Sequence, residues 1–198
     1  MKKIAHKIYL ILGHMYAFFW LNIYRLRDFL FKPKEDSILF VAHPDDDTLF
    51  FHTFIKERKP YVVLLTTGWS LRRIPGFKKN MRNYGVKFRF YALSTRETRM
   101  SLLEKYIKES FNIGNFKTCA THGENGEYGH EMHQRVHTAV LKCSPCEVLS
   151  TVDEEEILNF PLPEPVIDEK INIFKKYYKT ELFVLDLYDK WMSHEKLR

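Results

Sequence analysis

Two short segments of the chain carry side chains that together could bind a metal ion and activate water. The first segment is Ala42-His43-Pro44-Asp45-Asp46-Asp47. Pro44 fixes its own φ angle and ends the extended stretch before it, so the three carboxylates lie on a tight turn. One aspartate would be explained as a helix N-cap. Three in a row behind a histidine repel one another, and a cation relieves that repulsion better than a cap does.

The second segment, residues 121–137, combines a glycine-rich turn with three histidines at helical spacing. His130 and His133 are three residues apart and His137 is four further on, so these side chains project from one face of a predicted helix. One helix cannot close a zinc site by itself, but the first segment supplies the missing oxygen and nitrogen ligands. Two histidines and one aspartate with a fourth position open are typical of a catalytic zinc site. We expect a structural role for His137, and we expect His122 to line the pocket.

Both segments follow predicted β-strands in a chain where strands and helices alternate. Short apolar runs typical of buried parallel strands occur at Ser37–Ala42, Tyr61–Thr67, Lys87–Leu93, Phe116–Thr121 and Glu147–Val152. Helix-compatible stretches are Thr48–Glu57, Lys78–Tyr84, Glu97–Ser110, Glu131–Lys142, Asp168–Lys179 and Leu182–Trp191, and Phe160–Val166 is predicted to be a proline-rich loop. This alternation predicts an α/β domain whose mostly parallel sheet has helices on both faces. Ligands of such sheets bind beyond the carboxyl ends of the strands, where both segments lie.

The composition is that of an ordinary globular chain. Its 198 residues, 45% hydrophobic and 28% charged, fit one domain with an appendage and exclude collagen, rod and disordered classes. The net charge of +6 favours phosphate-bearing or membrane-surface partners, but it is too small to indicate nucleic acid, and we expect none. Three cysteines are too few for a disulfide-stapled secreted module, which favours a reducing compartment such as the cytoplasm.

The N-terminal part of the chain, residues 1–35, differs from the rest. Residues 8–23 are almost entirely apolar and lie between basic residues on both sides. This run is shorter than the roughly 20 apolar residues that a spanning helix needs, and no small-residue cleavage site of a signal peptide follows it. Three alternatives remain open: an extra helix packed on the domain, an amphipathic helix in the headgroup layer of a membrane, and a short anchor. We expect association of residues 8–23 with the cytoplasmic face of a membrane.

The motifs of the two segments together resemble those of a known enzyme family. His43-Pro-Asp-Asp and Gly-Glu-Tyr-Gly-His130-x-x-His133, in this order and roughly 80 residues apart, resemble the LmbE-like family of zinc-dependent N-acetylglucosamine deacetylases. This family includes the phosphatidylinositol-glycan class L enzyme and the mycothiol-pathway deacetylase. The resemblance extends from Ser37 to about Tyr178. It implies a Rossmann-like three-layer fold and an LmbE-like deacetylase domain over residues 36–198.

The resemblance assigns a role to five residues. It makes His43, Asp46 and His133 the ligands of one Zn²⁺ ion. It makes Asp45 the general base and His130 the residue that faces the developing oxyanion. Zinc lowers the pKa of bound water from about 15.7 toward 7 and so supplies the nucleophile, while the base takes a proton from that water and returns one to the leaving amine. The products would be acetate and a free amino sugar.

Recognition of the substrate is where the chain departs most from the family, because a basic run replaces its Arg…Glu pattern after the second strand. Two alternatives stay open for this run: a solvated basic face, or pairing of Arg72 or Arg73 with a phosphate that links the sugar to a lipid or nucleotide. Trp69 and Tyr128 are candidates for stacking on a sugar ring, with core or surface roles as the alternative. The predicted substrate is therefore an N-acetylated sugar of the N-acetylglucosamine type, or a glycolipid that carries one.

Two departures concern the site itself. Asp47 stands where the family commonly has glutamate, and Met132 stands where many members have an aspartate that could orient His130. Two alternative functions stay open: a catalytically silent sugar-binding or membrane scaffold protein, and an amidase that acts on another small N-acyl conjugate. Asp45 argues against the silent protein, because a binding module needs no base beside its metal. A nucleotide-binding dehydrogenase is disfavoured, because no Gly-x-Gly-x-x-Gly follows the first strand.

Overall fold

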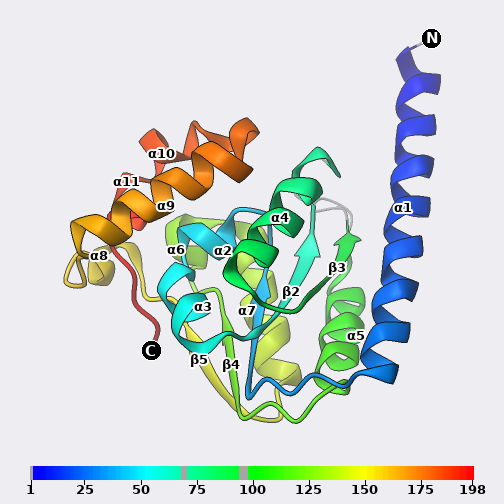
Figure 1. Cartoon of the computed structure of the whole chain (residues 1–198), viewed down its shortest axis with the longest axis horizontal. Coiled ribbons are helices and arrows are strands. Elements are labelled where there is room, and N and C mark those ends of the chain that lie inside the picture. The colour runs from blue at the N-terminus through cyan, green and yellow to red at the C-terminus, as the bar shows by residue number, and fades with distance from the viewer. Residues whose placement is uncertain (1, 68–70, 94–97) are drawn as a thin grey trace.

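The sheet has five parallel strands with the order β3-β2-β1-β4-β5 (Figure 1). The computed structural model describes residues 2–67, 71–93 and 98–198, without the side chains of residues 2–14, 17 and 92. The strands are β1 (Ser37–Val41), β2 (Tyr61–Thr66), β3 (Phe88–Leu93), β4 (Thr118–Thr121) and β5 (Glu147–Ser150). In β1, Ile38 lies beside Tyr61 of β2 and beside Cys119 of β4. The predicted α/β class with a mostly parallel sheet is confirmed.

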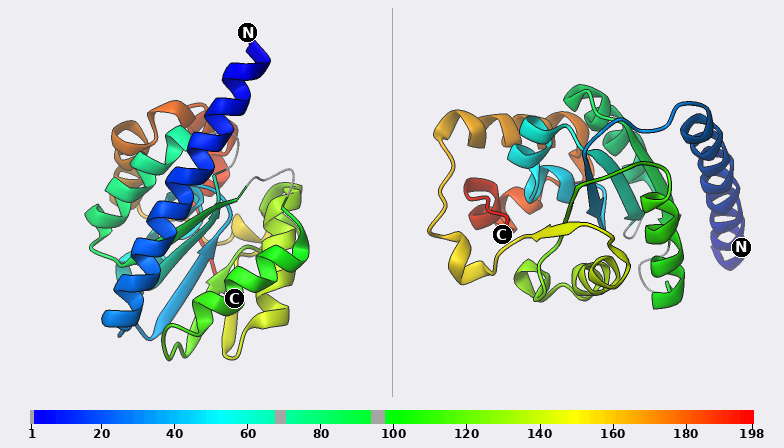
Figure 2. Two further views of the ribbon diagram at one scale, coloured as in Figure 1. Left: turned by 90° about the vertical axis from the view of Figure 1, so that its right-hand side faces the viewer. Right: turned by 90° about the horizontal axis from the view of Figure 1, so that it is seen from below.

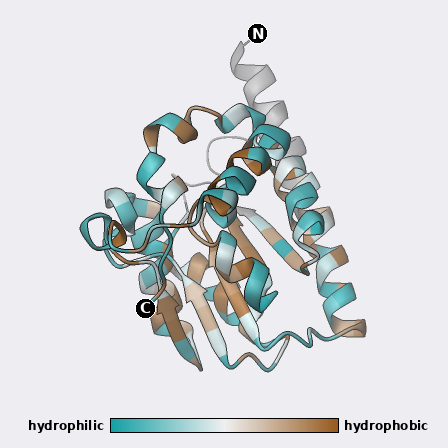
Figure 3. Cartoon of the chain, turned by 60° about the vertical axis from the view of Figure 1, so that its left-hand side comes forward, coloured by the Kyte–Doolittle hydropathy of each residue, from teal (hydrophilic) through white to brown (hydrophobic). Residues whose placement is uncertain are grey.

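Two hydrophobic cores, one on each face of the sheet, hold the helices in place. Alternate residues of β1 supply them: Leu39 and Val41 enter one core, and Ile38 and Phe40 enter the other, as the period of two in a strand requires. The first core is covered by α2 (Asp46–Leu49), α3 (His52–Arg58), α4 (Ile74–Tyr84), α8 (Glu154–Ile157), α9 (Glu164–Tyr177), α10 (Val184–Leu187) and α11 (Asp189–Ser193). The second is covered by α5 (Met100–Phe111) and α7 (Glu131–Cys143). Figure 2 shows the sheet between these helical layers, and Figure 3 shows that its strands are mostly apolar.

Three predicted element boundaries differ from the structure. The predicted helix Thr48–Glu57 is two short helices, with the buried Phe50 and Phe51 between them. These two residues have φ of −115° and −131°, outside the helical range, so the helix is interrupted there. The predicted loop Phe160–Val166 already contains the start of α9, since a proline in the first helical turn displaces no hydrogen bond. The predicted helix Leu182–Trp191 is likewise divided into α10 and α11.

Helix α1 (Lys2–Leu30) runs along strand β3 at the edge of the sheet (Figures 1 and 2). Its Leu21 and Tyr24 are buried, each in one of the two cores. Asp28, 3% exposed, accepts a hydrogen bond from the Tyr61 hydroxyl at 2.8 Å and pairs with the guanidinium of Arg89 in β3. The second half of α1 is thus packed on the domain. In the part of the chain that the structure describes, we find no helix with the length and hydrophobicity to cross a bilayer.

Candidate metal centre

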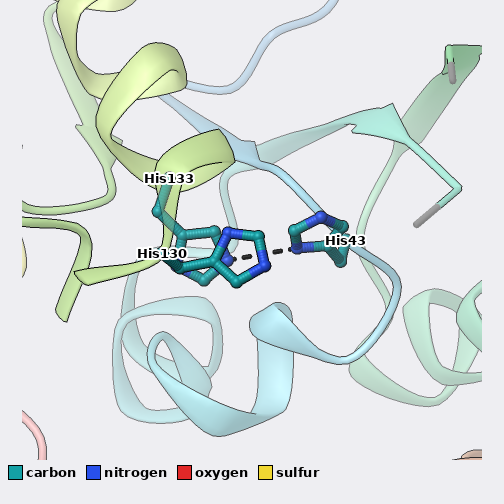
Figure 4. A group of neighbouring side chains, drawn as sticks. All are labelled: His43, His130 and His133. Carbon is teal, nitrogen blue, oxygen red and sulfur yellow. Dashed lines mark hydrogen bonds between the residues drawn. The ribbon is translucent and has the colours of Figure 1, made fainter. Parts of the chain in front are cut away.

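The two chemical segments meet at the carboxyl edge of the sheet because β1 and β4 are parallel neighbours. His43 lies just past the end of β1. Beyond β4 the chain crosses a one-turn helix, α6 (Gly126–Gly129), and enters α7, which carries His133. Figure 4 shows the rings of His43, His130 and His133 side by side, with a hydrogen bond between the first and the last. Segments about 90 residues apart therefore supply one cluster.

Three ligand atoms of this cluster form a nearly equilateral triangle. His43 Nδ1 lies 3.1 Å from His133 Nε2, and Asp46 Oδ2 lies 3.4 Å from each of these nitrogens. A tetrahedral zinc ion with ligands at 2.0–2.1 Å spaces them about 3.3 Å apart. All three residues are buried. Their donor set, two imidazoles and one carboxylate, can hold a metal ion, and the spacing fits zinc.

The protonation of these side chains suits a cation. Burial alone would raise the pKa of Asp46, but His133 and His43 hold it well below its usual range, so the carboxylate is ionised. Burial lowers the pKa of His133 to about 4, which leaves the imidazole neutral. Asp46 Oδ2 also accepts the backbone N–H of His43 at 2.6 Å, and this bond fixes the carboxylate within the turn.

Glu127 sets the orientation of His133. Its Oε2 lies 2.5 Å from His133 Nδ1, and its Oε1 accepts the backbone N–H of Gly123 and lies 3.1 Å from His122 Nδ1. A proton on His133 Nδ1 leaves the lone pair of Nε2 facing the cluster, as a metal ligand requires. The two imidazoles hold the pKa of Glu127 well below its usual range despite burial. Glu127 also has φ of +58°, a conformation that non-glycine residues rarely adopt, and such strain concentrates at functional sites.

The backbone orients His130. It takes the place of the aspartate that many members of the resembled family have at the position of Met132. His130 is the N-cap of α7, and its Nδ1 accepts the backbone N–H of Met132 at 3.2 Å. In the neutral ring the proton then resides on Nε2, where it can be donated. Burial and the neighbouring His43 lower the pKa of His130, so the neutral form is favoured. The ring stacks on His133 with centroids 4.4 Å apart.

A second group of three residues, Asp46, His122 and His133, also has ligand atoms close enough for a metal ion. In this group His122 Nε2 lies 3.0 Å from the backbone nitrogen of Ala42, whose N–H it accepts. Its Nδ1 faces Glu127. Because both ring nitrogens are engaged, His122 has no lone pair left for a cation. The set with His43 is therefore the better metal site of the two.

Asp45 lies beside this set and pairs with a buried arginine. Its Oδ1 contacts Nη2 of Arg73, whose Nε lies 2.7 Å from Oε1 of Glu181 in η2 (Lys179–Glu181). All three side chains are buried. Burial raises the pKa of Asp45 well above its usual range, although Arg73 acts in the opposite direction. Arg73 thus positions Asp45 in this structure, and its contact with a substrate phosphate stays a prediction.

Asp47, by contrast, belongs to the supporting structure. Its carboxylate accepts hydrogen bonds from the Tyr178 hydroxyl at 2.6 Å, from Asn80 at 2.7 Å and from the Thr48 hydroxyl at 3.0 Å. Burial raises its pKa to about 6, while these three donors oppose that rise. Asp47 is therefore fully hydrogen-bonded, although it is shorter than the glutamate common in the resembled family. Its bond to Tyr178 links the end of α9 to the turn that carries Asp46.

The other residues predicted to bind substrate lie in different settings. Tyr128 is half-buried beside His130 and stacks on Tyr188, with centroids 4.4 Å apart and planes 24° apart. Arg72 is exposed in η1 (Leu71–Arg73). Trp69 lies outside the described residues. His137 is buried, and its Nδ1 lies 2.7 Å from the His122 carbonyl oxygen, which agrees with a structural role.

Three residues at the site have no role in the sequence-based prediction. Glu127 is part of the Gly-Glu-Tyr-Gly motif, so the sequence places it near the site. Its hydrogen bonds to His122 and His133 could not be predicted from the sequence. Glu181 lies in η2, and no local pattern in the sequence indicates its contact with Arg73. Tyr188 has no signal in the sequence, because only the path of α10 and α11 brings it to Tyr128.

Comparison with known proteins supports the fold. No family model matches the chain. The chain is 23% identical to "Uncharacterized protein L374" of Acanthamoeba polyphaga mimivirus, over 74% of this chain and 76% of that protein. It also resembles the crystal structure of GalB, the 4-carboxy-2-hydroxymuconate hydratase from Pseudomonas putida, with a TM-score of 0.51 and 11% identity over 79% of this chain and 82% of GalB. At this identity the likeness concerns the fold alone.

Proposed function

We propose that the protein is a zinc-dependent hydrolase that removes the acetyl group from an N-acetylated sugar of the N-acetylglucosamine type. The observation that carries this proposal is the triangle of His43 Nδ1, His133 Nε2 and Asp46 Oδ2, with sides of 3.1, 3.4 and 3.4 Å. Its size matches three corners of a zinc tetrahedron, and the fourth corner is left for water or substrate. The ionised carboxylate of Asp46 and the neutral imidazole of His133 are the protonation states that bind a cation.

The chain supplies the remaining groups for amide hydrolysis. A bound zinc ion acidifies water and polarises the acyl carbonyl. Asp45 takes the proton from the attacking water and passes it to the amine nitrogen as the carbon–nitrogen bond breaks. His130 donates its Nε2 proton to the negative charge that develops on the carbonyl oxygen, a contribution of about 3 kcal/mol for one well-placed donor. One water is consumed, and acetate and a free amine are released.

An aromatic pair beside the histidines supports a sugar substrate. The Tyr128 and Tyr188 rings stack at the rim of the cluster, and Tyr128 meets His130 edge to face at 5.8 Å. A flat aromatic wall next to polar catalytic groups is the usual construction of a site for a small ring-shaped ligand. The exposed guanidinium of Arg72 lies on η1, next to Arg73, and is suited to a phosphate on the same substrate.

The test combines metal analysis with an acetate-release assay. We expect about one zinc per chain and release of acetate from free, nucleotide-linked or lipid-linked N-acetylglucosamine. Asp45→Asn is expected to keep the zinc and lose turnover, whereas His133→Ala is expected to lose both. Hydrolysis by Asp45→Asn at the wild-type rate would remove Asp45 from the role of base. Zinc binding without acetate release from any of these sugars, but with release from another N-acyl compound, would change the substrate class.

A further inference from the structure

Helix α1 has one face on the domain and an opposite face that no described part of the chain covers. The inner face carries the buried Leu21, Tyr24 and Asp28. The outer face carries exposed apolar side chains at helical spacing: Met15, Phe18, Phe19, Ile23, Leu26, Phe29 and Leu30. The exposed fraction reaches 67% at Phe18 and 80% at Phe29. Contiguous apolar surface of this kind marks an interaction site.

Between Met15 and Leu30, where the structure describes the side chains other than that of residue 17, this outer face carries no charged side chain. Asn22 is the polar residue on it, and its Nδ2 donates to the backbone carbonyl of Phe18 at 2.8 Å, so the amide is bonded within the helix. Phe31, just beyond the helix, extends the apolar strip and is 68% exposed. The strip is therefore free of side chains that would resist transfer into an apolar layer.

The charge of the chain is concentrated in the same segment. Residues 1–34 contain seven lysines and arginines and one acidic residue, a net charge of +6, which equals the net charge of the whole chain. Residues 35–198 therefore sum to zero. The single acidic side chain, Asp28, is buried against Arg89. An apolar strip inside a segment that carries all of the positive excess is complementary to an anionic, apolar partner.

We propose that the outer face of α1 docks into the headgroup layer of an anionic lipid bilayer. Its phenylalanine and leucine side chains enter the acyl boundary, and the lysines and arginines that flank them contact lipid phosphates. A second copy of the chain fits this face poorly, because symmetric pairing would bring two segments of +6 together. The bilayer supplies both the apolar layer and the opposite charge.

The contacts of α1 make this docking rigid. Arg25 pairs with Glu109 of α5 at 2.7 Å, and Lys78 of α4 lies 3.2 Å above the ring of Trp20. With the buried pair of Asp28 and Arg89, these contacts bind the helix to three other elements. A bilayer that holds α1 therefore holds the whole domain in one orientation.

That orientation bears on the metal centre. The N-terminal half of α1 continues past the edge of the sheet at which the strands end (Figures 1 and 2), which is the edge that carries the histidine cluster. Docking through the outer face of α1 thus fixes the orientation of this edge relative to the lipid surface. If the proposed function holds, a lipid-linked acetylated sugar is a substrate class that such a fixed orientation can serve.

Vesicle sedimentation with the full-length protein tests the docking. The probes are vesicles of phosphatidylcholine alone and vesicles of equimolar phosphatidylcholine and phosphatidylglycerol. The test variant combines Phe19→Glu with Leu26→Glu on the outer face of α1. The control combines Leu141→Glu with Leu158→Glu. It replaces two exposed leucines elsewhere and changes the net charge by the same amount. All four positions are exposed, so neither variant disturbs a core. Deletion of α1 is unsuitable, because it would leave the buried Arg89 without Asp28.

We expect the wild type and the control to sediment with the mixed vesicles and to be released by high salt. The test variant is expected to partition at least about tenfold more weakly. Absence of sedimentation with the mixed vesicles, or equal loss in both variants, would overturn the proposal. So would a lipid-free dimer that only the test variant dissociates, since the face would then belong to a second copy. None of these readouts depends on hydrolysis, so the proposed function stands or falls separately.

Discussion

At the residue scale, Glu127 connects the two buried histidines of the site. It engages the Nδ1 atoms of both His122 and His133, and it does so from a backbone conformation with φ of +58°. A carboxylate that accepts from a ligating imidazole fixes the tautomer of that imidazole and raises its basicity. The strain at Glu127 is the cost of aiming its carboxylate at both rings.

Replacing Glu127 by glutamine tests this orientation. The amide keeps the size of the side chain, but it cannot accept hydrogen bonds from all the donors around it. We expect the affinity of Glu127→Gln for zinc to fall about 10-fold to 100-fold, measured by competition with a chromogenic chelator. Glu124→Gln, at an exposed position of the same turn, is the matched control and is expected to bind zinc normally. Unchanged zinc affinity in Glu127→Gln would show that another group orients His133.

Replacing Arg73 by lysine tests how Asp45 is held. Lysine keeps the charge, but it cannot contact Asp45 and Glu181 at once through two separate nitrogens. We expect kcat to fall about 10-fold to 100-fold through misplacement of Asp45, with zinc content retained. Arg82→Lys, at an exposed position of α4, is expected to keep the wild-type kcat. A change in KM alone for Arg73→Lys would instead support the predicted contact with a substrate phosphate.

At the scale of elements, parallel strands and the turns after them create the site. β1 and β4 are parallel neighbours. The turn with Asp46 and the start of α7 follow these two strands, so they lie close together at the same end of the sheet. One outermost strand of the sheet, β3, is covered by α1. The buried pair of Asp28 in α1 and Arg89 in β3 joins the two elements. Removing one partner of such a pair leaves an uncompensated charge.

We therefore expect Asp28→Ala to lower the free energy of unfolding by about 3 kcal/mol, because Glu109 at 3.2 Å compensates Arg89 only in part. Urea denaturation measures this change. Asp36→Ala removes the exposed partner of Lys117 and is expected to change the same quantity by less than about 0.5 kcal/mol. Equal effects of the two substitutions would mean that α1 contributes little to the stability of the domain.

Much of this arrangement was predictable from local sequence. The five strands could be predicted from apolar runs. The residue types of the two segments indicated a metal cluster, and the family resemblance selected His43, Asp46 and His133 as its ligands. The break at Phe50 could not be predicted, because the run Thr48–Glu57 contains no proline or glycine that would interrupt a helix. The role of Glu181 was not visible either, since its contact with Arg73 joins residues more than a hundred positions apart. Pairing across such distances is decided by the packing of whole elements and leaves no local pattern.

At the scale of the whole molecule, the proposed metal ion links segments from both halves of the chain. A ligand that binds only the folded state stabilises it by mass action, by about 2.7 kcal/mol at a concentration of 100 times Kd. For a chain of this length we expect zinc to raise Tm by about 5–10 °C, measured by differential scanning fluorimetry with and without zinc. His133→Ala is expected to show no such rise. A rise of equal size in that variant would place the ion elsewhere.

Anomalous diffraction at the zinc absorption edge, from crystals grown with zinc, tests the central claim most directly. The proposed site requires one anomalous peak about 2.0–2.2 Å from His43 Nδ1, His133 Nε2 and a carboxylate oxygen of Asp46. No peak at this position, or a peak coordinated by His122 in place of His43, would contradict the account.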